Sequence, residues 1–127
     1  MTRSAEQRIQ DILGSIDRCR RYATSLDSAN RDLVDMAEDA VERNLQIIGE
    51  AASHLPAEIT DSHPEIAWPQ IRGFRNILVH QYFGVDVETV RDVIETYLPT
   101  LEAVLRTYAG EWRISCHVSA TNWICLT

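Results

Sequence analysis

The sequence predicts an all-α protein that folds as an up-and-down antiparallel helical bundle. Apolar residues recur at three- and four-residue spacing over long segments, which is typical of amphipathic helices. Capping and helix-breaking residues bound these segments, and the loops between them are mostly short, which favours antiparallel neighbours. At 127 residues the chain suits one domain with one core. We assign residues 1–110 to the bundle and residues 111–127 to a C-terminal tail.

Two long helices are expected in the first half of the chain. The first should run from Ser4 to Thr24, because Ser4 and Gln7 fit a capping box. The second should run from Asn30 to His54, where Pro56 stops it. The first helix has one apolar stripe, formed by Ile9, Ile12, Leu13, Ile16, Cys19 and Ala23. The second has an apolar face formed by Leu33, Met36, Ala37, Ala40, Val41, Asn44, Ile48, Ala51, Ala52 and Leu55.

The apolar face of the second helix is unusually wide, because Leu45 and Ile47 extend it near its middle. Such a face is typical of a helix that contacts more than one neighbour, and a second subunit is one candidate. Asn44 interrupts the face. It is interpreted either as a hydrogen-bonded core residue or as one that fixes the packing register.

Two further helices are expected after a turn-rich connection over residues 57–68. Pro69 suits the first position of a third helix, whose core side includes Ile71, Phe74, Ile77 and Leu78. Asp86 is a suitable N-cap for a fourth helix, which Pro99 should kink. The fourth apolar stripe is formed by Val87, Val90, Ile94, Tyr97, Leu98, Leu101, Leu105 and Tyr108. The tail has poor helical periodicity, and a short strand, an ordered arm and a frayed end all stay open.

Composition narrows the classes of function. The net charge of −7 argues against a protein that coats nucleic acid by bulk positive charge, although all twelve basic residues are arginine, which binds phosphate through a two-pronged fork. The three cysteines form no metal-binding pattern and are expected to be reduced thiols. No apolar run could cross a membrane, and the N-terminus lacks the apolar region of a secretory signal, so we expect a cytoplasmic protein.

The stretch RNILVHQYFG, from Arg75 to Gly84, places three chemically capable side chains in an apolar setting. Histidine can give or take a proton near neutral pH, and arginine can stabilise negative charge on phosphorus. RNA carries its own nucleophile, the 2′-hydroxyl, so Arg75, His80 and the Tyr82 hydroxyl suit metal-free cleavage of RNA. Purely structural roles are also compatible with the residues alone. Arg75 could snorkel to an acidic residue, His80 could cap a helix and Tyr82 could lie at the edge of the core.

The geometry of a continuous helix would not bring the side chains of Arg75 and His80 together. Five residues correspond to roughly 140° of rotation on a continuous helix, so the two side chains would point apart. Asn76 and His80, four residues apart, would share a face. Either the helix ends or distorts near His80, or a symmetric dimer brings residues of two subunits into one cleft.

The spacing Arg75-x4-His80-x-Tyr82 is also the R-x4-H-x-Y motif of HEPN-domain RNase toxins of the HepT type, and the chain resembles that family over about residues 5–109. AVERNLQIIGEAASHLP resembles the family's second long helix, and HPEIAWPQIRGFRNILVHQYFGVD resembles its signature segment. VIETYLPTLEAVL resembles its last helix with the internal proline. The tail beyond about Gly110 does not resemble the family pattern.

The resemblance implies an HEPN-like helical bundle that forms a homodimer or higher oligomer, with two motifs facing a shared cleft. It implies a metal-independent endoribonuclease toxin without a cofactor. Arg75 and His80 would be catalytic, with Asn76 and Tyr82 in support. The partner implied is an MntA-type nucleotidyltransferase antitoxin that AMPylates Tyr82, which would block RNA sterically and by charge.

Two alternatives to a ribonuclease stay open from the sequence. One is a non-catalytic helical module that binds a minimal nucleotidyltransferase. The other is a structural four-helix bundle in which Arg75, His80 and Tyr82 serve only capping and surface roles. Toxicity on expression of the chain alone is expected only of the ribonuclease.

Overall fold

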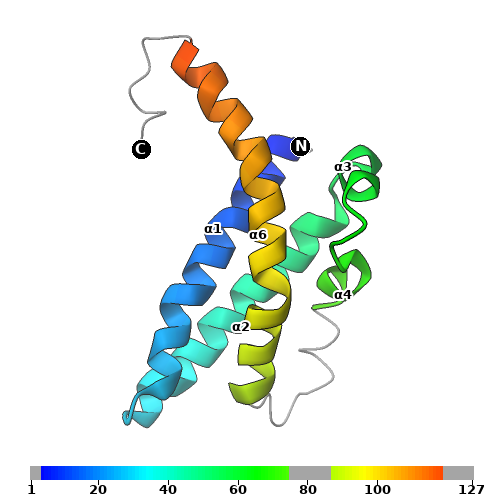
Figure 1. The fold of residues 1–127 in the computed structure, drawn as a ribbon. Helices are drawn as coiled ribbons and strands as arrows, with labels where there is room; N and C mark the ends of the chain where they lie inside the picture. The colour runs from blue at the N-terminus through cyan, green and yellow to red at the C-terminus, as the bar shows by residue number, and fades with distance from the viewer. Residues whose placement is uncertain (1–3, 75–86, 119–127) are drawn as a thin grey trace.

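The computed structural model of the chain describes residues 4–74 and 87–118, with side chains of the last helix described from residue 88 to residue 109. The described residues form helices joined by turns, with no strand among them (Figure 1). The elements are α1 (Ala5–Ala23), the 3-10 helix η1 (Thr24–Asp27), α2 (Arg31–Ser53), α3 (Ala57–Ser62), α4 (Trp68–Arg72) and α6 (Val87–Val118). The predicted all-α fold is therefore confirmed.

The three long helices form the body of the molecule. In Figure 1, α1 runs in one direction, whereas α2 and α6 run back beside it. The short helices α3 and α4 lie along one side, where the chain returns from the end of α2 towards the start of α6. No helix in the described part of the chain combines the length and the apolar character that a membrane span needs.

The start of α1 is determined by local sequence. The Ser4 hydroxyl accepts a hydrogen bond from the Gln7 amide at 3.1 Å, and the Gln7 side chain accepts one from the Ser4 amide at 2.9 Å. This reciprocal pair is the predicted capping box. Five of the six predicted stripe residues are buried, and Ala23 is partly buried against the core.

The start of α2 is capped by Asn30, whose side-chain oxygen accepts hydrogen bonds from the amides of Asp32 and Leu33 at 3.0 and 3.3 Å. Most of the predicted apolar face is buried, but Leu33 is 39% and Met36 63% exposed. The sequence places these two residues on the apolar face of α2, and the structure leaves both on the surface of the single chain. Both lie in the first turns of α2.

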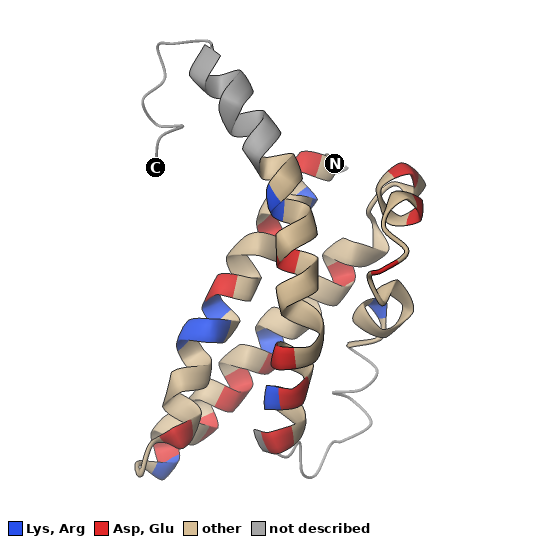
Figure 2. Ribbon diagram, in the orientation of Figure 1, with Lys and Arg blue, Asp and Glu red and all other residues tan. Residues whose placement is uncertain are grey.

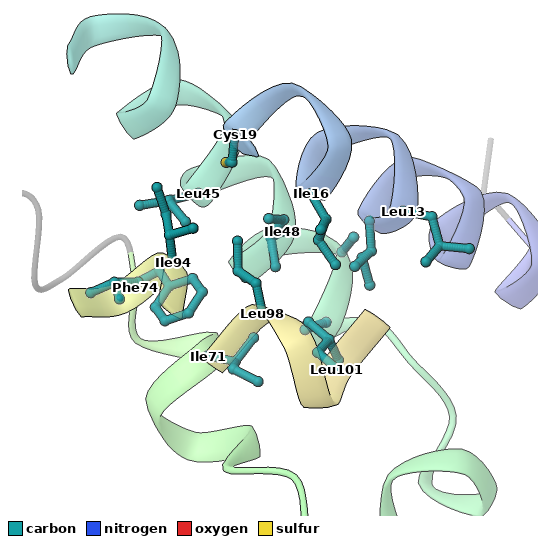
Figure 3. Close-up of a cluster of buried hydrophobic side chains, with 14 of the residues drawn as sticks. Leu13, Ile16, Cys19, Leu45, Ile48, Ile71, Phe74, Ile94, Leu98 and Leu101 are labelled. Atoms are coloured by element: carbon teal, nitrogen blue, oxygen red, sulfur yellow. The ribbon is translucent and has the colours of Figure 1, made fainter. Parts of the chain in front are cut away.

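One hydrophobic core joins α1, α2, α4 and α6 (Figure 3). Its fully buried side chains include Ile9, Ile12 and Ile16 from α1, Val41, Leu45 and Ile48 from α2, Ile71 from α4, Phe74 just after α4, and Val90, Leu98, Leu101 and Leu105 from α6. Asn44 is buried among them, and its amide nitrogen donates to the Ala40 carbonyl at 2.8 Å. Within the described residues its side-chain oxygen has no hydrogen-bond partner.

Helix α6 is longer than the sequence predicts. It continues past Gly110 to Val118. Part of the C-terminal tail, for which the sequence allows a strand, an ordered arm or a frayed end, is therefore helical. Pro99 lies inside α6 without ending it, and its ring is exposed. Glu102 of α6 accepts hydrogen bonds from Arg20 of α1 at 2.5 Å and from Arg106 at 2.9 Å. These contacts join the first helix to the last.

Candidate functional site

The predicted site residues Arg75, Asn76, His80 and Tyr82 all lie outside the described residues, as does the predicted N-cap Asp86. Their roles and their mutual geometry therefore stay predictions. The structure describes the two flanks of this segment, which end at Phe74 and begin again with α6 at Val87 (Figure 1).

The leading flank is a short, well-anchored helix. Helix α4 begins at Trp68 with Pro69 in its first turn, as the proline predicts. The predicted helix does not continue unbroken, however, because Gly73 forms a turn after Arg72. The Gly73 amide donates to the carbonyls of Pro69 and Gln70, both at 3.1 Å, which closes α4 after five residues.

Two residues anchor this flank in the core immediately before Arg75. Ile71 and Phe74 are each only 1% exposed. The Phe74 ring lies 5.7 Å from the ring of Tyr97 on α6, centroid to centroid, and Figure 3 shows Phe74 beside Ile94 of the same helix. The chain is thus held against α6 where it leaves the described residues.

A second set of contacts holds the connection before α4. The indole nitrogen of Trp68 donates to the His63 carbonyl at 3.0 Å. The His63 ring nitrogen Nε2 lies 2.9 Å from the Tyr108 hydroxyl on α6, and the two rings meet edge to face. His63 thus ends α3 and also ties the connection to α6.

The trailing flank is the first turns of α6. Val90 is 1% exposed, and Arg91 forms an ion pair with Asp27 of η1. Figure 2 shows that acidic residues dominate this end of α6, and Glu88, Asp92 and Glu95 are all exposed. Arg72 on the leading flank is exposed, and no ion pair joins it to another described residue.

Three side chains elsewhere have shifted pKa values: Cys19, Glu42 and Glu102, the last of which has a lowered pKa. Burial raises the pKa of the Cys19 thiol to about 12, so this cysteine stays protonated and unreactive. Burial also raises the pKa of Glu42, aided by the nearby acids Asp39 and Glu38. No group of three or more His, Cys, Asp or Glu side chains suited to a metal ion occurs in residues 4–74 and 88–109.

Comparison with known proteins connects the whole bundle to one family. The family model described as "Ribonuclease HepT-like" matches residues 12–108, a range that includes Arg75, Asn76, His80 and Tyr82. "Probable ribonuclease HepT" of Thermococcus cleftensis is 31% identical over 102 residues, which cover 80% of this chain and 93% of that protein.

Two other relatives show the same likeness over different lengths. A protein of Methanocaldococcus jannaschii, named as a candidate RNase, is 32% identical over 94 residues, covering 74% of this chain and 81% of its own length. Another candidate RNase, from Caldanaerobacter subterraneus, is 41% identical over 63 residues, covering 50% and 56% of the two chains. No solved structure matches the chain.

Proposed function

Because the chain belongs to the HepT-like ribonuclease family, we propose that it is a metal-independent endoribonuclease whose catalytic residues are Arg75 and His80. The observation that carries this proposal is the match of the family model across the bundle and the R-x4-H-x-Y motif together. Helices alone would not suggest a reaction, since many unrelated functions share helical bundles.

The proposed chemistry follows from the residue types. His80 takes the proton of an RNA 2′-hydroxyl, whose oxygen then attacks the adjacent phosphorus. The bond from phosphorus to the 5′-oxygen breaks, a proton passes to that oxygen, and a 2′,3′-cyclic phosphate remains. Arg75 stabilises the extra negative charge that phosphorus carries between these events. Asn76 is proposed to orient His80, and Tyr82 to contact RNA.

A homodimer is proposed because one chain offers a single motif histidine, whereas the reaction needs a base and an acid. Two motifs in one cleft would supply both imidazoles. The exposed Leu33 and Met36 support pairing, since exposed apolar side chains close together on one helix are typical of interfaces. The surface around them carries Asp32, Asp35 and Asp39, so a neighbour there would also need polar contacts.

The proposed biological setting is a toxin–antitoxin system in the cytoplasm. An MntA-type nucleotidyltransferase would bind the ribonuclease and transfer AMP from ATP to the Tyr82 hydroxyl, releasing pyrophosphate. Each AMP adds a negatively charged phosphate beside the cleft, which repels the RNA backbone.

The test of the ribonuclease is cleavage of RNA by the purified chain in EDTA. We expect cleavage by the wild type and its loss in Arg75→Ala and in His80→Ala, with growth inhibition lost in the same variants. A control variant, Arg21→Ala, changes an exposed arginine on α1 and should cleave normally. Intact RNA with a folded wild-type protein would contradict the proposal and favour the non-catalytic binding module.

The test of the regulation is intact-mass measurement after incubation with the nucleotidyltransferase and ATP. The wild type should gain mass in steps of one AMP, and Tyr82→Phe should gain none. An equal gain in both proteins would place the modification on another residue.

A further inference from the structure

Gly49 lies in the interior of α2, directly against the chain that leads to Arg75. A methyl carbon at position 49 would lie 3.0 Å from the carbonyl oxygen of Ile71 and 3.5 Å from that of Arg72. It would also lie 3.5 Å from the Phe74 Cβ. The first two neighbours are backbone atoms, which cannot rotate away as the end of a side chain can. A methyl carbon at position 49 would therefore press on the Ile71 carbonyl, which would have to give way by a few tenths of an ångström, whereas its distance from the Arg72 carbonyl is an ordinary contact.

Glycine is otherwise a poor choice for this position. It disfavours the interior of a helix relative to alanine, because it loses more conformational freedom on folding. Gly49 is buried, and its neighbours Ala51 and Ala52 show that α2 accepts alanine nearby. The close approach of α4 gives a physical reason for glycine at this position.

Gly14 in α1 provides the opposite case. A methyl carbon there would meet only Nη1 of Arg18 at 3.6 Å, an ordinary contact with the mobile end of a side chain. Gly14 is therefore not needed for packing, and it serves as a matched control for Gly49.

We propose that Gly49 is a positioning residue for RNA cleavage, which rests on the proposed ribonuclease function. It lets α2 contact the backbone of residues 71–72 and so determines where the chain leaves the core at Phe74. Arg75 is the next residue in the sequence. Phe74 is itself buried, and its Cβ lies 3.5 Å from where the methyl carbon at position 49 would be, so the backbone that Gly49 positions ends at the residue before Arg75.

The experiment compares Gly49→Ala with Gly14→Ala in RNA cleavage, each assayed well below its melting temperature. Catalysis is sensitive to small errors in position, so we expect kcat of Gly49→Ala to fall by about tenfold or more, with KM nearly unchanged. Gly14→Ala should keep the wild-type kcat and raise the melting temperature by up to about 4 °C. Wild-type kcat in a folded Gly49→Ala would overturn the proposal.

A double-mutant cycle separates positioning from a general loss of structure. If Gly49 acts through Arg75, Gly49→Ala should cost much less in an Arg75→Lys background than in the wild type. An equal fold-loss in both backgrounds would overturn the proposal. Should Gly49→Ala not fold, Phe74→Leu is the second test, because it alters the packing of the residue before Arg75 and keeps that residue apolar. An unchanged kcat in Phe74→Leu would also overturn the proposal.

RNA cleavage by the wild type distinguishes failure of the proposed ribonuclease function from failure of the proposed role of Gly49. A wild-type chain that does not cleave RNA overturns the ribonuclease function, and this inference with it. A wild-type chain that cleaves, together with a fully active Gly49→Ala, overturns only the role of Gly49.

Discussion

At the scale of single residues, polar contacts at half-buried positions secure the chain that precedes the motif. The sequence around His63 does not predict a specific contact for this residue, because no potential metal ligand lies at a suitable spacing from it. In the structure its ring meets the Tyr108 hydroxyl, and its carbonyl accepts from the Trp68 indole. One residue thus joins α3, the start of α4 and the far part of α6.

The first prediction concerns the contact between the His63 ring and the Tyr108 hydroxyl. Tyr108→Phe removes the hydroxyl but keeps the ring, and we expect it to lower the free energy of unfolding by about 1 kcal/mol, the typical net value of one hydrogen bond. Urea unfolding followed by circular dichroism measures the loss. Tyr22→Phe is the control, because no described hydrogen bond involves the Tyr22 hydroxyl and its ring is also half-buried. Equal effects in the two variants would contradict the assigned contact.

At the scale of helices, one carboxylate joins the first helix to the last. Burial alone would raise the pKa of Glu102, but hydrogen bonds from Arg20 and Arg106 outweigh it and hold the pKa below its ordinary value. The folded state therefore favours the charged carboxylate. Its contribution to stability is complete above the ordinary glutamate pKa of about 4.3 and is lost as the pH falls through the lowered folded-state pKa.

The second prediction follows from the lowered pKa of Glu102. Glu102→Gln should lower the free energy of unfolding at pH 7 by up to about 1 kcal/mol, because both arginines are partly exposed to solvent. The difference from the wild type should shrink in acid, as the pH falls through the lowered pKa of Glu102 and the wild-type carboxylate becomes protonated. Urea unfolding at several pH values measures it. The exposed Glu95→Gln should show little difference at any pH, and a Glu102→Gln effect that persists in acid would argue against this origin.

At the scale of the whole molecule, α2 is buried over its middle but leaves apolar side chains exposed in its first turns. Val41, Leu45 and Ile48 are fully buried within the chain, but Leu33 and Met36 stay exposed on the same helix. The wide apolar face thus contributes to the core of the chain over its middle and stays exposed in its first turns. The proposed twofold pairing would cover them.

The third prediction tests that pairing. Met36→Asp places a charge on the exposed apolar surface and should shift the chain from dimer to monomer, measured by analytical ultracentrifugation. RNA cleavage should fall at concentrations where the variant is monomeric, since each cleft would need two chains. Gln10→Asp adds the same charge to an exposed position on α1 and should leave the assembly unchanged. A fully dimeric Met36→Asp would exclude this surface as the interface.

Local chemistry explains why many features could be predicted. The capping box at Ser4, the Asn30 cap and the proline at the start of α4 depend on residues within one turn of each other. The apolar stripe of α1 is likewise a property of local spacing. The motif residues Arg75, Asn76, His80 and Tyr82 came from a pattern in the sequence, and their arrangement in space stays a prediction.

What the sequence by itself determined is the helical class, the position of the long helices and the membership of a ribonuclease family, because periodicity, caps and motif spacing are written along the chain. Only the tertiary structure decided that Leu33 and Met36 lie outside the core, that Gly73 interrupts the third helix and that His63 reaches Tyr108. The same holds for Gly49, whose missing side chain matters because a distant carbonyl lies 3.0 Å from the place where a methyl carbon would be. These features depend on contacts between residues far apart in sequence, which periodicity along one chain does not encode.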